Sequence, residues 1–402
     1  LLIQGISREN LIKNIKYFVL PAFIAASVVL IFFVDISSIL GLRDYLIRPF
    51  SMWERVLTET RVIIFYISLL LYPTYSRLML NHDFVISRSL LDPWTTLAAI
   101  LAIVCCIGFS IWIAKKKPLI SYCIIFFFLN HIIEGSIIPV ELVFEHRNYI
   151  PSLLFFVPLA VFVSHVLDYF SYRKSMQLMI TLLISFILIA QGHTVHMYNY
   201  IFKDPYILWS DNIAKAPNLS RPHNNMGNVL WNWGLYDEAY KSYEKSFNLK
   251  RHDILPMAAA PINNMGRYYF FKKDYGAAMT HFQASIKIHP KYALTRINIA
   301  RTQIRMNDLK GAEKTTREGL SHSPDNAWLH AISSFLLLKQ GAYQNSLKEA
   351  WKTIAIDSES TDVTRVLAET YRRTGHIDRA ILYWEEYVSA YNDEIEGYLA
   401  LI

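Results

Sequence analysis

The chain has 402 residues, of which 53% are hydrophobic and 18% are charged, and its formal net charge is +7. Its mean hydropathy is +0.22. This profile is typical of a membrane protein with a soluble appendage rather than of one globular domain. Much of the basic charge flanks apolar segments, where membrane topology accounts for it, so nucleic-acid binding is disfavoured.

Five segments in the first half are apolar enough to be predicted as membrane-spanning helices. They are Tyr17–Val34, Trp94–Ala114, Leu119–Ile138, Leu153–Phe170 and Met176–Ala190. Each approaches the ~20 residues that a bilayer requires, and a backbone in lipid must be helical. A sixth run, Val62–Tyr72, is short and lies between Arg61 and Pro73. Such a run is more often interfacial, re-entrant or buried than spanning.

Basic clusters predict how these segments are oriented. Lys13 and Lys16 precede the first segment, Lys115–Lys117 follow the second, and Arg173 and Lys174 follow the fourth. Lys and Arg mark the cytoplasmic side, and all clusters agree if the Val62 run does not cross. The N-terminus is then cytoplasmic. Residues 35–93, 134–151 and everything after Gln191 lie outside the cytoplasm.

A 34-residue period appears from about Asp204 onward. One column of small residues contains Gly227, Gly266, Ala300, Ser334 and Ala368. A second small column contains Ala239, Ala278, Ala312, Ser346 and Ala380, and a column of mostly larger residues contains Tyr243, Phe282, Thr316, Ala350 and Trp384. Prolines end units at Pro217, Pro290 and Pro324, and a five-residue insertion falls around His252–Pro261. This is the tetratricopeptide pattern, in which helix pairs stack on their neighbours.

The predicted fold class is therefore all-α, with a polytopic helical membrane domain followed by a tetratricopeptide-repeat α-solenoid. The membrane domain covers residues 1–203, with about five transmembrane helices and one interfacial or re-entrant helix, the Val62 run. The extracytoplasmic repeat domain covers residues 204–402, with a half unit at DPYILWSDNIAKAP, five repeats and a partial cap at Asp393–Ile402. The three cysteines, Cys105, Cys106 and Cys123, lie in apolar runs and are interpreted as small buried residues.

The strongest candidate for chemistry is the polar stretch FEHRNYIPS between two apolar segments. It contains Glu145, His146 and Arg147, and Glu134 and Glu141 lie nearby. Arg can hold a phosphate with two parallel hydrogen bonds, and Glu or His can accept a proton. The alternative is an interfacial loop whose charges are solvated or paired.

A second polar stretch, SRLMLNHDFVISRSLLDP, is predicted on the same outer side. Its His82, Asp83 and Arg88 either complete a polar site or lie in a solvated loop. His193 and His196 have a spacing that suits a metal, but no third ligand is evident, so no metal ligands are assigned. No phosphate-binding glycine loop or nucleophile elbow occurs, and the sequence indicates no cofactor.

Asparagines recur near the first-helix positions of the repeats. Asn225, Asn264 and Asn298, with the adjacent Asn224 and Asn263, are candidates for binding the backbone of an extended peptide on the concave face. The alternative is that they are merely solvated.

Three stretches in order, RVIIFYISLLLYP, SRLMLNHDFVISRSLLDP and IIPVELVFEHRNYIPSLLFFVPLA, precede the repeats. This ordered set resembles the bacterial relatives of the transmembrane and tetratricopeptide-repeat O-mannosyltransferases, which have the GT-C glycosyltransferase architecture. The resemblance covers nearly the whole chain. It implies an enzyme of the bacterial inner membrane that transfers a sugar from a polyprenyl-phosphate carrier to a protein hydroxyl outside the cytoplasm.

The resemblance carries Arg147, with Glu145 and His146, over as contacts to the carrier headgroup, and Arg88 and Glu134 are added as candidates beside them. The resemblance implies that the chain is the C-terminal portion of such an enzyme, or a derivative that lost catalysis, because several N-terminal membrane helices of the architecture are missing from this sequence. An acid in the first external loop is the expected base, but Asp35 and Asp44 do not form a paired-acid motif. No divalent metal is indicated. The alternative function is a non-catalytic, membrane-anchored scaffold that docks a protein partner.

Overall fold

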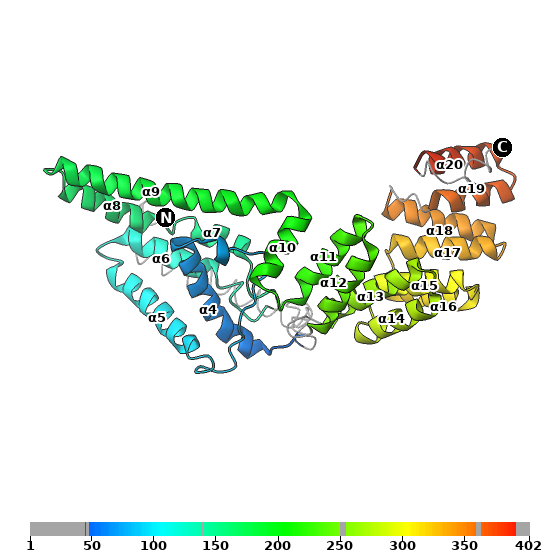
Figure 1. The fold of residues 1–402 in the computed structure, drawn as a ribbon, viewed down its shortest axis with the longest axis horizontal. Coiled ribbons are helices and arrows are strands. Elements are labelled where there is room, and N and C mark those ends of the chain that lie inside the picture. The colour runs from blue at the N-terminus through cyan, green and yellow to red at the C-terminus, as the bar shows by residue number, and fades with distance from the viewer. Residues whose placement is uncertain (1–44, 46–47, 139, 250–254, 359–362, 391–402) are drawn as a thin grey trace, which may run out of the picture. The chain divides into compact units, whose positions relative to one another are not determined.

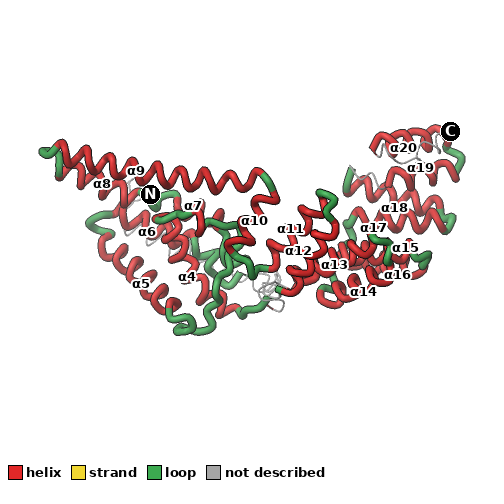
Figure 2. Tube along the Cα trace, viewed as in Figure 1, coloured by secondary structure: helices red, strands yellow, loops and turns green. Residues whose placement is uncertain are grey.

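The computed structural model describes residues 45, 48–138, 140–249, 255–358 and 363–390. Every regular element in these ranges is helical, in agreement with the predicted all-α class (Figure 2). The chain divides into two compact units, Leu1–Pro217 and Asn218–Ile402. The predicted span Tyr17–Val34, the acids Asp35 and Asp44, and the tail Asp393–Ile402 lie outside the described residues.

The first unit contains seven α-helices and three short 3-10 helices within its described residues (Figure 1). In chain order they are α4 (Met52–Leu71), η3 (Tyr75–Arg77), α5 (Thr95–Ile113), α6 (Pro118–Asn130), η4 (Glu145–Asn148), α7 (Tyr149–Ser152), α8 (Val157–Tyr169), α9 (Lys174–Tyr200), η5 (Ile201–Lys203) and α10 (Pro205–Lys215).

Helix α4 forms the core of this unit. It begins at a capping box, in which Ser51 and Glu54 exchange side-chain-to-backbone hydrogen bonds and satisfy the first free amides. Its buried apolar face, Val62, Tyr66 and Leu69, packs against Leu78 and Val143. The predicted run Val62–Tyr72 is therefore the second half of a longer helix with a buried apolar face. Its prediction as an interfacial or re-entrant helix stays a prediction.

Two helices of the described residues are long and apolar enough to cross a membrane. They are α5 and the continuous segment Lys174–Lys203, which contains α9. In the most apolar 18-residue window of the second segment, no residue is buried against the rest of the protein. The predicted Trp94 helix is confirmed as a helix, and the Met176 helix extends well beyond its predicted end.

The other two predicted spans are not single continuous helices. Helix α6 ends at Asn130, and residues 131–138 form turns, so the prediction of a helix over Leu119–Ile138 is wrong in its second half. Helix α8 begins only at Val157 and reaches membrane length when joined to the segment Glu145–Ser152 across a bend of 55°. A Pro at the start of α6 and another at the start of α8 fit the helix first turn, where no amide is needed.

Helix α10, predicted as a half repeat, is held within the first unit. Asp211 accepts a hydrogen bond from the Tyr75 hydroxyl at 2.7 Å and pairs with Lys215 at 2.7 Å. Lys215 also donates to the Leu78 carbonyl at 2.9 Å. These bonds attach the helix to the segment that follows α4.

The second unit consists of five helix pairs in its described part. The first helices are α11 (Ser220–Asn232), α13 (Leu255–Phe271), α15 (Ala293–Arg305), α17 (Ala327–Lys339) and α19 (Thr364–Arg373). The second helices are α12 (Tyr236–Asn248), α14 (Tyr275–Ile288), α16 (Leu309–His322), α18 (Tyr343–Ile356) and α20 (Ile377–Ala390). Consecutive first helices contact one another, so they form a continuous layer.

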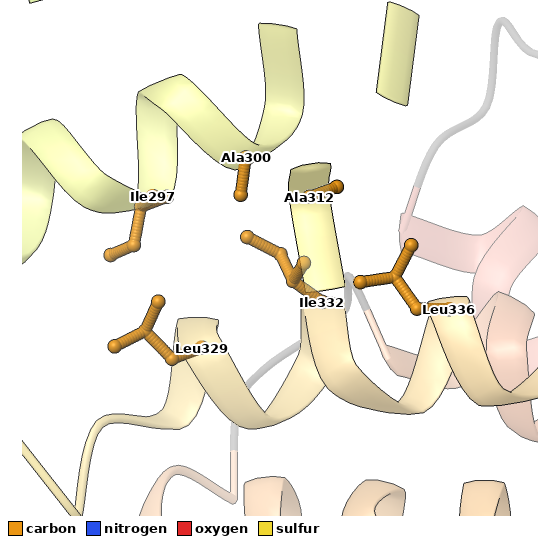
Figure 3. Packing of buried hydrophobic residues seen from close by; sticks show 6 residues of the cluster. All are labelled: Ile297, Ala300, Ala312, Leu329, Ile332 and Leu336. Carbon is orange, nitrogen blue, oxygen red and sulfur yellow. The ribbon is translucent and has the colours of Figure 1, made fainter. Parts of the chain in front are cut away.

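The predicted columns are buried and meet inside each helix pair. A methyl group on Gly227 would lie 2.4 Å from the Tyr243 ring, and one on Gly266 would lie 2.5 Å from the Phe282 ring. Where the small residue is Ala300 instead, the opposing residue shrinks to Thr316, and both are buried. The smaller opposing side chain thus leaves room for the Ala300 methyl, as dense packing requires. Figure 3 shows Ala300 and Ala312 with Leu329 and Ile332 of the following repeat.

A left-handed residue occupies the same position in all five turns between paired helices. Gly234, Gly341 and Gly375 have φ near +78°, and the equivalent Lys273 and Asn307 have φ of 62° and 61°. Glycine adopts this conformation without steric cost, asparagine does so at a modest cost, and lysine rarely does so. Lys273 is therefore the exception in this series.

Buried hydroxyls form a further column that the sequence analysis did not identify. Ser246 donates to the Ser220 carbonyl at 2.9 Å, and Ser285 donates to the Ala259 carbonyl at 2.9 Å, each tying a second helix to the start of its partner. The predicted insertion partly lengthens α13 at its N-terminus, where Pro261 lies inside the helix.

Candidate functional sites

In the first unit, side chains of α4 hold two polar loops in place. Arg61 donates to the Val85 carbonyl at 2.6 Å, and Thr58 accepts from the Ser87 amide at 2.8 Å. The Tyr66 hydroxyl donates to the Phe144 carbonyl at 3.0 Å and accepts from the Phe144 amide at 2.8 Å. Both stretches singled out in the sequence are therefore anchored to the same helix.

Arg55 organises the loop between α6 and η4. Its side chain is fully buried. Its Nε donates to the Ser136 carbonyl at 3.1 Å, Nη2 donates to the Glu134 carbonyl at 2.8 Å, and Nη1 donates to the Val140 carbonyl. A rigid guanidinium fork can satisfy several carbonyls of an irregular loop at once.

A carboxyl group, Glu59, lies beside this guanidinium. Its Oε1 is 2.7 Å from Arg55 Nη2, yet no donor of the described residues is aligned for a hydrogen bond to that oxygen. Burial raises the pKa of the Glu59 carboxyl to about 8, and the nearby charge of Glu134 adds to this, while Arg55 and Arg147 oppose it. Burial also raises the pKa of Glu134. Two carboxyl groups and two guanidinium groups thus share one environment.

Replacing Glu59 with Gln is expected to remove a pH dependence of stability. The pKa is raised from 4.5 to about 8 in the folded protein, so its contribution to stability is complete below pH 4.5. That contribution is lost as the pH rises through about 8. Thermal unfolding of both proteins in detergent at pH 6 and pH 9 checks this. The Glu59→Gln protein should be the more stable of the two at pH 9, and an unchanged difference between the pH values would contradict the assignment.

Glu145 links the two polar stretches. Its Oε1 accepts from the Met79 amide at 2.9 Å and lies 3.0 Å from His82 Nε2. The structure thus brings together parts of the two stretches that the sequence analysis considered as one outer site. Glu145 is engaged in holding these loops to each other. Its predicted contact to a carrier headgroup stays a prediction.

Arg147 is a half-buried guanidinium of this region with unused donors. Its Nη1 donates to the Glu141 carbonyl at 2.8 Å, and its guanidinium lies 4.8 Å from the Phe144 ring centre. No other partner of Arg147 occurs within the described ranges. It lies near Glu59 and Glu134, whose carboxyl pKa values its charge lowers. This arrangement can bind an anion at Arg147 beside a carboxyl group that is protonated at neutral pH.

The other predicted residues of the first unit lie at its surface. His146 is exposed, with its ring 5.0 Å from that of Phe144, and Arg88 is exposed in the turn before α5. His193 and His196 are exposed on α9. Cys105 and Cys106 are exposed on α5, so the prediction that they are buried is wrong, whereas Cys123 is buried as predicted. No group of three or more metal-ligating side chains occurs among the residues that the structure describes.

In the second unit, the asparagines form a ladder between successive first helices. Asn264 Nδ2 donates to Asn224 Oδ1 at 3.0 Å and to Asn228 Oδ1 at 3.2 Å. Asn298 Nδ2 donates to Asn263 Oδ1 at 2.9 Å. Asn264 and Asn298 are buried and Asn225 is half-buried, so the first two help to join repeats. Their peptide-binding role stays a prediction.

A pocket of about 410 Å³ opens beside this ladder. Residues of α11, α13 and α15 line it, together with the turn before α14 and α14 itself. Its charged lining residues are all cationic, namely Arg267, Lys273, Arg301 and Arg305. Aromatic rings, among them Trp231 and Phe271, form much of the rest. An open pocket of this composition is suited to an anionic group next to an apolar one.

Sequence reasoning missed both clusters. The spacing of Arg55 and Glu59, four residues apart before an apolar run, was the available signal for a polar face on α4. Arg267 and Arg301 directly follow the small residues Gly266 and Ala300, so their shared position in the repeat was a signal for the pocket.

The second unit is a tetratricopeptide-repeat array. Two tetratricopeptide-repeat family models match the chain, one over residues 220–253 and the other over residues 272–334. These ranges cover α11 and α12, and α14 to α17, where the alternation of helices and the buried small residues are seen directly. No curated protein matches the chain.

Several solved repeat proteins are similar to this chain at low identity. A tetratricopeptide-repeat protein of Thermus thermophilus is 14% identical, with 45% of this chain and 96% of that chain covered and a TM-score of 0.39. The protein pilF of Pseudomonas aeruginosa is 14% identical, with 53% and 93% covered and a TM-score of 0.40. YrrB, described as having an unusual peptide-binding site, is 15% identical, with 48% and 96% covered and a TM-score of 0.34.

Proposed function

We propose that this chain is a membrane-anchored protein that binds polypeptide through the first-helix layer of its repeat array. The observation that carries the proposal is the combination, in one chain, of a tetratricopeptide array with an apolar helix whose spanning window is entirely unburied. Such arrays build extended binding surfaces from stacked first helices. An unburied apolar helix of that length is stable in lipid and costly in water.

Site-specific photo-crosslinking in native membranes tests this proposal. A photoreactive amino acid replaces Phe271, which is 46% exposed on α13, or the exposed Lys348 on the second helix α18. We expect polypeptide adducts from position 271 and few from position 348. The chain should also stay in the membrane pellet after an alkaline wash. Equal adducts from both positions, or release by the wash, would contradict the proposal.

A second candidate function is glycan transfer from a polyprenyl-phosphate carrier. The observation that favours it is Arg147, a guanidinium with unused donors beside Glu59 and Glu134. Arg binds phosphate well, and a buried carboxyl with a pKa of about 8 can exchange a proton near neutral pH. The order of the three sequence motifs before the repeats also supports it.

Replacing Arg147 with Ala separates the two candidates. If the chain takes part in transfer, the variant should lose the added glycan mass on the polypeptides that it crosslinks, while crosslinking itself continues. Lys203→Ala, a change at an exposed lysine after α9, is the matched control and should retain the glycan. Unchanged acceptor masses in the Arg147→Ala protein, measured by intact mass spectrometry, would count against transfer.

A further inference from the structure

We infer that the pocket across α11, α13 and α15 selects an acidic polypeptide segment that carries an apolar side chain next to its carboxylates. The inference rests on the proposed function and names the class of partner that the array accepts. The pocket gathers Arg267, Lys273, Arg301 and Arg305 around an aromatic wall that includes Trp231 and Phe271.

The four cations of the pocket are not neutralised by the protein itself. None of them pairs with a carboxylate in the described part of the chain. Two cations of the same repeats that do not line the pocket are paired: Lys272 with Asp237 at 3.2 Å, and Arg296 with Glu318 at 2.9 Å. Four like charges in one concave site repel one another, and an anionic ligand relieves that repulsion.

Two of the cations are oriented by aromatic rings. The Arg267 guanidinium lies 4.7 Å from the Trp231 ring centre, and that of Arg301 lies 6.0 Å from the Phe270 ring centre. These contacts hold the planar groups against the wall without using up their hydrogen-bond donors. A carboxylate can therefore be bound by donors that are already in place, with an adjacent apolar side chain against the rings.

Lys273 brings a further cation to the pocket from the turn before α14. It has φ of 62° at the turn position where three of the five repeats have glycine and one has asparagine. The turn imposes this conformation in every repeat, and lysine adopts it less readily than glycine or asparagine. Here this lysine adds the fourth cation to the pocket.

The backbone of an extended chain also has a partner in this pocket. Asn298 lines it, and its Nδ2 already donates to Asn263, which leaves Oδ1 to accept a peptide amide. Single-stranded nucleic acid also combines phosphates with stacking bases, but it would need cations repeated along its length. These cations are instead gathered in one pocket, which favours a short acidic segment.

Fluorescence anisotropy with the full chain in detergent tests the inference. The probe is a labelled ten-residue peptide rich in Glu with two Leu and one Phe, and its counterpart has Gln in place of every Glu. We expect the Glu peptide to bind at least about tenfold more tightly, and added salt to weaken it. Arg301→Glu with Arg305→Glu should weaken it by about 30-fold or more. Lys310→Glu with Lys348→Glu, at exposed second-helix positions, makes the same change in net charge and should leave affinity within about twofold.

Lys273→Gly separates a role in binding from a purely structural role of this lysine, because stability and peptide affinity should change in opposite directions. Relief of the strained turn should raise the Tm, while loss of the cation should weaken the Glu peptide by about threefold. Equal affinity for both peptides, unchanged by the Arg301 and Arg305 substitutions, would overturn the acidic pocket but leave polypeptide binding intact. Tighter binding of a ten-nucleotide single strand would also overturn it. If neither peptide binds, the inference fails, and crosslinking from position 271 then decides the proposed function separately.

Discussion

Arg55→Ala is expected to destabilise the first unit by about 3 kcal/mol or more, because it leaves a buried carboxyl and three loop carbonyls without their partner. Arg55 is fully buried and donates to the carbonyls of Glu134, Ser136 and Val140. Alanine has no side-chain donor that could replace these hydrogen bonds. The loop that carries Glu134 should therefore open.

The buried thiol of Cys123 reports that opening. In a protein in which Cys105 and Cys106 are replaced with Ser, alkylation of Cys123 requires the first unit to open. A loss of about 3 kcal/mol corresponds to labelling that is about 100-fold faster when closing outpaces alkylation. The control is Arg61→Ala, about two turns along the same helix, which loses an exposed bond to Val85 and a partly buried bond to Ser87. It should cost no more than about 1.5 kcal/mol. Equal labelling rates of the two variants would show that Arg55 stabilises the first unit no more than Arg61 does.

Gly266→Ala is expected to destabilise the second unit although alanine is the better helix former. The added methyl would lie 2.5 Å from Cε1 of Phe282, a ring that is almost completely buried. Overpacking of a dense core costs about 1–3 kcal/mol, and the gain in helix propensity is at most about 1 kcal/mol. We expect a net loss of about 1–2 kcal/mol. Hydrogen exchange of α13 and α14, followed by mass spectrometry, measures it.

Gly276→Ala provides the matched control for this substitution. A methyl there meets only Asp274 Oδ1 at 3.7 Å, so the change should be neutral or stabilising. The double variant Gly266→Ala with Phe282→Thr copies the natural pair Ala300 and Thr316 of the next repeat. It should show a favourable coupling of about 0.5–3 kcal/mol between the two sites. Strictly additive effects would mean that the small and large columns do not pack against each other.

The repeat array was largely predictable from the sequence because its packing is local and periodic. The same three positions meet in every helix pair, so Gly227 and Tyr243 already predict a contact that the structure contains. What could not be predicted was how individual polar residues are used. Asn264 and Asn298 occupy positions where a peptide could be bound, but their bonds to asparagines of the preceding repeat depend on the exact rotation of adjacent helices.

The first unit was less predictable because hydropathy measures composition and not where a helix ends. The apolar stretch Leu119–Ile138 is predicted as one span, yet α6 ends at Asn130. The chain then turns, and Arg55 donates hydrogen bonds to carbonyl groups of the turn. That arrangement joins residues about 80 positions apart, a distance at which local patterns carry no information. Membrane insertion of this unit, its orientation and its localisation stay predictions.

The most direct test of the account is hydrogen exchange of the full chain in detergent with and without the Glu-rich peptide. We predict added protection in the last turns of α11, α13 and α15, around Trp231, Phe271 and Arg305, where the pocket lies. The second helices α16, α18 and α20, which do not line the pocket, should change little. Protection confined to those second helices, or to the loops around Arg147 in the first unit, would contradict polypeptide binding by the first-helix layer.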